Sequence, residues 1–107
     1  MTLRTWLDTR SPRPPEHLAR RIDEVLGEAL DTPARGETER SRACLAAADE
    51  LLGDLLSRGT AGRESALDLL TVDALATYAF EAASDAPEKI PDRAADAMRR
   101  FAAIARQ

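Results

Sequence analysis

Apolar residues recur every three or four positions in separate segments of the chain, a spacing that predicts four amphipathic helices. The first helix follows Pro14 and Pro15, because a residue without an N–H group is well tolerated at a helix start. The second ends at Arg58 and Gly59, a basic last turn followed by a glycine. The predicted apolar stripes are Leu18, Ile22, Val25, Leu26, Ala29 and Leu30 in the first helix, Leu45, Ala48, Leu51, Leu52, Leu55 and Leu56 in the second, and Ala94, Met98, Phe101, Ala102 and Ala105 in the last.

The third helix is predicted from about residue 60 to residue 84, and it is the most apolar of the four. Its central run, "LLTVDALATYAFEAAS", projects apolar residues onto two opposite sides of the helix. This pattern predicts a central helix with neighbours around most of its circumference. Asp73 lies within the run, and burial of a carboxylate is costly unless it is paired. We therefore expect Asp73 at the rim of the bundle, or in an ion pair with Arg99 or Arg100.

The segments between the helices are short and contain proline or glycine, as in "DTPARGE" and "SDAPEKIP". Short connections favour antiparallel neighbours, so the sequence predicts an all-α fold, a four-helix up-and-down bundle formed by residues 14–107 as one domain. Residues 1–13 are predicted to dock on the bundle as a short N-terminal helical segment, through Leu3, Trp6 and Leu7. The alternative is that this segment is a docking peptide for a partner protein.

The charge of the chain changes along its length. Residues 43–92 hold 10 acidic and 3 basic side chains, whereas residues 93–107 hold 4 basic and 1 acidic. This contrast predicts that the last helix lies against acidic helices. The net charge of −4 and the isoelectric point near 5.0 argue against a general nucleic-acid binder, which needs a basic surface.

The single cysteine, Cys44, cannot form an internal disulfide, and its place beside an apolar stripe predicts a buried structural thiol. The N-terminus lacks the apolar run of a signal peptide, and no segment has the length of a membrane span, so we expect a cytoplasmic protein. The only histidine, His17, lacks the Glu three positions earlier that di-metal bundles use. The sequence therefore predicts no metal site of that kind, no cofactor and no catalytic motif.

The functional prediction is a non-enzymatic protein–protein interaction or self-associating module, with a protein partner or a second copy and with neither nucleic acid nor membrane. A thin bundle with an apolar third helix has more hydrophobic surface than three small neighbours cover. The alternative is a small-ligand or metal-binding bundle that uses Asp73 and Glu81. The residues proposed for a ligand or an interface are Asp73, Thr77, Glu81, Tyr78 and Trp6.

The stretch "GRESALDLL", residues 62–70, resembles the helix start of acyl carrier proteins, which are small, acidic and four-helical. That family attaches its cofactor to a serine in an Asp-Ser-Leu context, whereas this chain reads Glu-Ser-Ala around Ser65. The resemblance implies a further alternative, a carrier protein modified at Ser65.

Two octapeptides, "DEVLGEAL" at residues 23–30 and "DELLGDLL" at residues 49–56, share one pattern. The pattern is compatible with a duplication or with convergence of two amphipathic helices. Glycine inside a helix is unfavourable, so Gly27 and Gly53 are predicted to mark close helix crossings.

Overall fold

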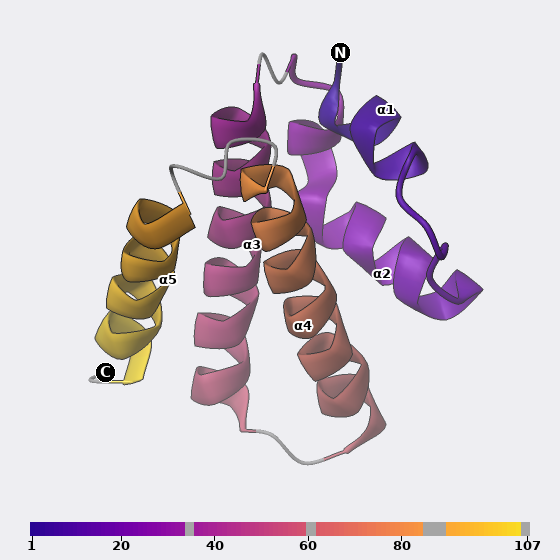
Figure 1. Ribbon diagram of the computed structural model, residues 1–107. Helices are drawn as coiled ribbons and strands as arrows, with labels where there is room; N and C mark the ends of the chain where they lie inside the picture. The colour runs from indigo at the N-terminus through magenta and orange to yellow at the C-terminus, as the bar shows by residue number, and fades with distance from the viewer. Residues whose placement is uncertain (34–35, 60–61, 85–89, 106–107) are drawn as a thin grey trace.

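The computed structural model describes residues 1–33, 36–59, 62–84 and 90–105, and it is all-α (Figure 1). The predicted four-helix up-and-down bundle with a short N-terminal helical segment is confirmed. The elements are α1 (Leu3–Asp8), α2 (Glu16–Leu26), the 3₁₀ turn η1 (Gly27–Leu30), α3 (Glu37–Arg58), α4 (Arg63–Ala83) and α5 (Ile90–Ala105).

The long antiparallel pair α3 and α4 forms the centre of the bundle (Figure 1). Helix α2 packs on one side of this pair, against both α4 and α3, and α5 packs on the other side. The chain direction alternates from α2 to α5, as short connections between neighbouring helices favour. Helix α4 therefore packs against α2, α3 and α5, in agreement with the central position predicted for it.

Local sequence signals account for the ends of several helices. Thr2 caps α1, where its Oγ1 accepts a hydrogen bond from the Thr5 N–H at 3.2 Å. Helix α3 ends at Arg58, followed by Gly59 with a φ of 94°, a conformation that glycine adopts without strain. The first predicted helix is shorter than its apolar stripe, because Gly27 adopts a φ of 52° and the chain continues as η1.

The prediction that Gly27 and Gly53 mark close helix crossings is wrong. Gly27 ends α2, whereas Gly53 lies inside α3. A Cβ atom added at either position would meet nothing within 4 Å. The two octapeptides thus have different structures despite their shared pattern.

The core consists mainly of leucine and alanine side chains from all the helices. The buried cluster comprises Leu3, Trp6, Ile22, Leu26, Leu30, Cys44, Leu45, Ala47, Ala48, Leu75, Ala79, Ala82 and Ala97. An ion pair between Arg100 and Asp49, with N and O atoms 3.6 Å apart, joins α5 to α3. This contact is of the kind expected from a basic last helix beside acidic ones. None of the described helices combines the length and the apolarity that a bilayer crossing requires.

Candidate functional site

Helix α4 carries two apolar stripes, which lie on opposite sides. The inner stripe is buried against the neighbouring helices, with Thr71 and Leu75 fully covered. The outer stripe comprises Leu69, Asp73, Ala76 and Phe80, spaced by four, three and four residues. Leu69 is 44% exposed and Phe80 is 42% exposed, so large apolar side chains of this stripe face solvent. The α4 pattern thus leaves one hydrophobic side partly open to solvent in the described part of the chain.

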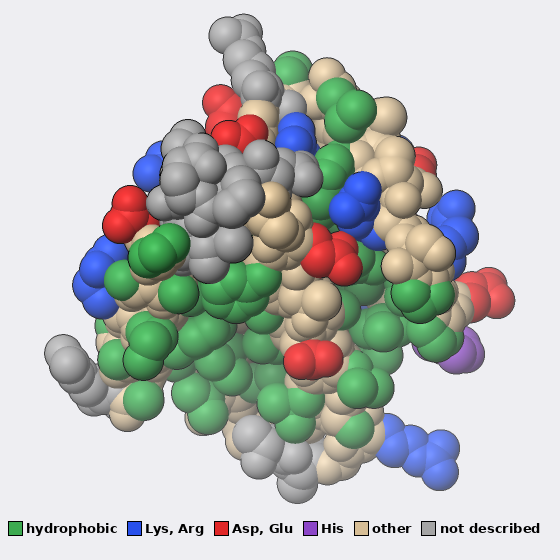
Figure 2. Space-filling view, viewed as in Figure 1, with side chains coloured by type: hydrophobic (Ala, Val, Ile, Leu, Met, Phe, Trp, Pro, Cys, Tyr) green, Lys and Arg blue, Asp and Glu red, His purple; other side chains and the backbone are tan. Residues whose placement is uncertain are grey.

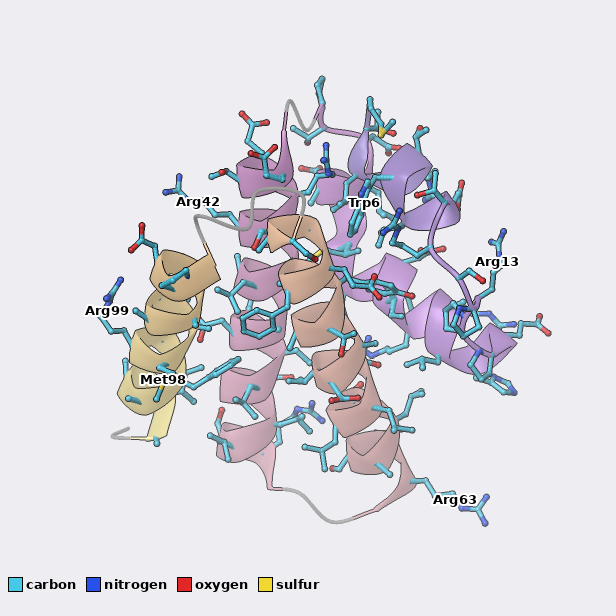
Figure 3. The ribbon with its side chains drawn as sticks, in the orientation of Figure 1. Trp6, Arg13, Arg42, Arg63, Met98 and Arg99 are labelled. Atoms are coloured by element: carbon cyan, nitrogen blue, oxygen red, sulfur yellow. The ribbon has the colours of Figure 1, made fainter. Side chains whose placement is uncertain are left out.

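Helix α5 carries a second exposed stripe, and α3 lies between α5 and α4 in the view of Figure 1. Ala95, Met98, Ala102 and Ala105 recur with spacings of three, four and three residues, and all are exposed. Met98 is 72% exposed, the largest value among the large hydrophobic side chains described. Figure 3 shows Met98 on α5, and Figure 2 shows hydrophobic side chains gathered from α5 across α3 to α4. We call the two exposed stripes together the α4/α5 face.

Asp73 occupies the middle of the outer stripe of α4. It is exposed, so its predicted rim position is correct. The ion pair expected with Arg99 or Arg100 is not formed. Arg99 contacts Asp96 at 3.7 Å, and Arg100 contacts Asp96 at 3.3 Å as well as Asp49.

Thr77 and Glu81 follow Asp73 at four-residue spacing along α4. The Thr77 hydroxyl donates to the Asp73 carbonyl at 2.9 Å, a local helix contact. Glu81 follows Asp73 by eight residues, which is about 12 Å along a helix. Within the described part of the chain, no group of three or more His, Cys, Asp or Glu side chains could hold a metal ion. The alternative of a ligand or metal site at Asp73 and Glu81 therefore has no geometric support and stays a prediction.

Tyr78 and Trp6 lie together, away from the outer stripe. Their rings meet edge to face with centroids 6.4 Å apart, and the Arg10 guanidinium lies 4.7 Å from the Trp6 centroid. Trp6 is only 4% exposed, so its ring is buried where α1 meets η1 and α4 (Figure 3). Burial and the charge of Glu81 raise the pKa of Tyr78. The pair is part of the core rather than a free recognition surface.

The buried carboxylate of α4 is Asp68, which the sequence reasoning missed. Its side chain is 6% exposed, and it accepts hydrogen bonds from Arg21 Nε at 2.7 Å and Arg58 Nη2 at 3.1 Å. The hydrogen bond from Arg21 is the main cause that lowers the pKa of Asp68, and Arg58 adds to it. Asp68 thereby connects α4 to α2 and α3. The sequence did contain one indication that Asp68 is buried. It precedes Leu75 by seven residues, so the two side chains lie on the same side of the helix.

A cleft surrounds this ion-pair network, but its charges are already satisfied. Arg21 also contacts Glu24 at 3.1 Å, and Arg58 contacts Asp54 at 2.9 Å. Each guanidinium therefore has two carboxylate partners. The network stabilises the packing of three helices, and its own charges are paired with one another, whereas Glu64, which also lines the cleft, lies outside it.

The serine of the carrier resemblance is buried. The Ser65 hydroxyl donates to the Gly59 carbonyl at 3.4 Å beneath the start of α4. A carrier serine must present its hydroxyl to a modifying enzyme, so this placement gives the carrier hypothesis no support.

Cys44 is fully buried in α3, and burial raises the pKa of its thiol to about 12. Because the thiolate is the reactive form, we expect Cys44 in the native protein to react on the order of 10³-fold more slowly than a free cysteine. Thiol titration with a chromogenic disulfide at pH 8 would show this, with rapid reaction after denaturation as the control. Rapid labelling of the native protein would contradict the buried position.

The comparisons with known proteins assign neither a family nor a function to the chain. No protein-family model matches the chain, and neither the curated proteins nor the solved structures contain a match.

Proposed function

We propose that the protein is a non-enzymatic interaction module that self-associates through the α4/α5 face. The single observation that carries the proposal is the exposure of Leu69, Phe80 and Met98 on two adjacent helices. Scattered apolar residues on a surface need no explanation, but a contiguous apolar patch is typical of an interaction site. The proposal keeps the expectation of a cytoplasmic protein that binds neither nucleic acid nor membrane.

The spacing of the exposed residues supports a helical partner. Both stripes alternate steps of three and four residues, the repeat by which helices pack along a shared seam. The outer stripe of α4 repeats the spacing with which its inner stripe packs within the bundle. A second pair of helices could therefore cover the α4/α5 face by the same mode of packing, and a second copy of the chain supplies such a pair.

Two neighbouring leucines offer a matched test of this proposal. Leu69 lies in the outer stripe of α4, whereas Leu70 is turned about 100° around the helix and is 57% exposed. We expect Leu69→Gln to weaken self-association by about 10- to 100-fold, because each dimer would lose two buried leucines. Leu70→Gln should change the affinity by less than about threefold, since surface contacts outside an interface core contribute little.

The measurement is sedimentation equilibrium of the wild-type protein and both variants over a range of about 10–500 μM, because association follows mass action. Circular dichroism of each variant verifies that it is folded. A wild-type chain that stays monomeric throughout this range would contradict the proposal. Equal weakening by the two substitutions would also contradict it, because the effect would then not depend on the α4/α5 face.

A further inference from the structure

The arrangement of charges and side-chain sizes on the α4/α5 face selects one way of joining two copies. This inference rests on the proposed function and adds the orientation of the partner. A two-fold axis in the plane of the face can run parallel to the helices or perpendicular to them. The parallel axis places α4 of one copy on α5 of the other, whereas the perpendicular axis places α4 on α4 and α5 on α5.

Charge favours the parallel axis. Asp73 is the central residue of Arg63–Ala83, so antiparallel packing of α4 on α4 would bring two exposed carboxylates together. Arg99 lies near the middle of α5, which runs antiparallel to α4 with α3 between the two helices in the view of Figure 1. Arg99 points outward (Figure 3), and its contact with Asp96 is a long 3.7 Å pair at the surface. With the parallel axis, Asp73 of each copy faces Arg99 of the other.

Side-chain size favours the same orientation. The outer stripe of α4 contains the large residues Leu69 and Phe80, whereas the stripe of α5 is mainly alanine. Packing α4 on α5 therefore places large side chains against small ones, the alternation that lets helices interlock closely. Packing α4 on α4 would place large residues against each other, and packing α5 on α5 would leave space between the alanines.

We infer that two copies associate with α4 of each on α5 of the other, and that Asp73 of one copy pairs with Arg99 of the other. The dimer then contains this ion pair twice. The partner recognised by the α4/α5 face is accordingly a second copy of the chain, held in one orientation by opposite charges.

A charge-reversal cycle tests this orientation. Asp73→Arg and Arg99→Asp each replace two attractive pairs by two repulsive ones, so each should raise the dimer dissociation constant by about tenfold. The double variant restores opposite charges and should recover the wild-type constant within about threefold. The measurement is sedimentation equilibrium at low salt, and thermal unfolding of dilute samples verifies that each monomer remains folded.

The outcomes separate this inference from the proposed function. Weakening by both single variants with recovery in the double variant supports the orientation. A wild-type dimer whose constant is unchanged in all three variants, or not recovered in the double variant, overturns the orientation while self-association stands. An Asp73→Cys variant that forms a disulfide-linked dimer with itself would also overturn it, because only α4 on α4 brings these positions together. A wild-type monomer at every concentration overturns both.

Discussion

Replacement of Trp6 by alanine is expected to lower the free energy of unfolding by about 3–5 kcal/mol, the usual cost of removing a buried aromatic ring. The ring is 4% exposed and belongs to the main core cluster. It meets Tyr78 edge to face, and the guanidinium groups of Arg10 and Arg40 lie 4.7 and 5.6 Å from its centroid. Its removal therefore leaves a cavity between α1 and the bundle and also loses the ring contacts.

Chemical denaturation followed by far-ultraviolet circular dichroism measures this loss. Tryptophan fluorescence cannot be used, because Trp6 is the only tryptophan and the variant lacks it. Arg4→Ala is the matched control on the same helix. Arg4 is about half exposed, and its contacts with Asp23 and Asp31 are 3.9 and 4.0 Å long, so its replacement should cost less than about 1 kcal/mol. A loss below about 1 kcal/mol in Trp6→Ala would contradict the docked position of α1.

Replacement of Asp68 by alanine is expected to lower the free energy of unfolding by about 2–3 kcal/mol. Removing one partner of a buried ion pair costs about 3–5 kcal/mol when the remaining charge stays buried. Arg21 and Arg58 are partly exposed and retain Glu24 and Asp54 as partners, so the loss is smaller here. Asp73→Ala is the matched control on the same helix, and it should change monomer stability by less than about 0.5 kcal/mol.

The contribution of Asp68 also depends on pH. Hydrogen bonds from Arg21 and Arg58 hold its pKa below the usual range in the folded protein. A carboxylate with a lowered folded pKa stabilises the fold above its unfolded pKa of about 4, and this stabilisation is lost as the pH falls toward the folded pKa. The difference in stability between wild type and Asp68→Ala should therefore be largest near neutrality and shrink below about pH 4. A difference that stays constant down to pH 2 would contradict the ion-pair network.

The sequence was sufficient for the fold class because helix periodicity and breakers are local signals. Which of the two carboxylates Asp68 and Asp73 is buried, however, is not determined by the local sequence. Both carboxylates lie in a helix with apolar residues on two sides, and spacing does not say which side faces the core. That choice depends on Arg21 and Arg58, which lie 47 and 10 residues away and meet Asp68 only in the folded bundle. Of the two alternatives predicted for Asp73, the exposed position is the one found, and Arg99 and Arg100 pair with Asp96 and Asp49 instead.

The α4/α5 face was predicted only in part. An excess of apolar surface on the third helix could be inferred from its two stripes. The contribution of α5 was missed, because Met98, Ala102 and Ala105 were assigned to its buried stripe. In the structure, Ala97 and Ile104 are buried instead, and Met98 faces solvent. A helix rich in alanine gives a weak periodic signal, so its orientation could not be read from the sequence.

Coverage of the α4/α5 face by a second copy can be measured directly, because the chain contains two methionines. Met98 lies on that face, whereas Met1 is equally exposed near α1 and serves as an internal control. The measurement is NMR spectroscopy of ¹³C-methyl-methionine protein in a dilution series. We expect the Met98 methyl signal to shift with concentration while the Met1 signal stays fixed. A Met98 signal that is independent of concentration, or a shift of Met1 alone, would contradict it.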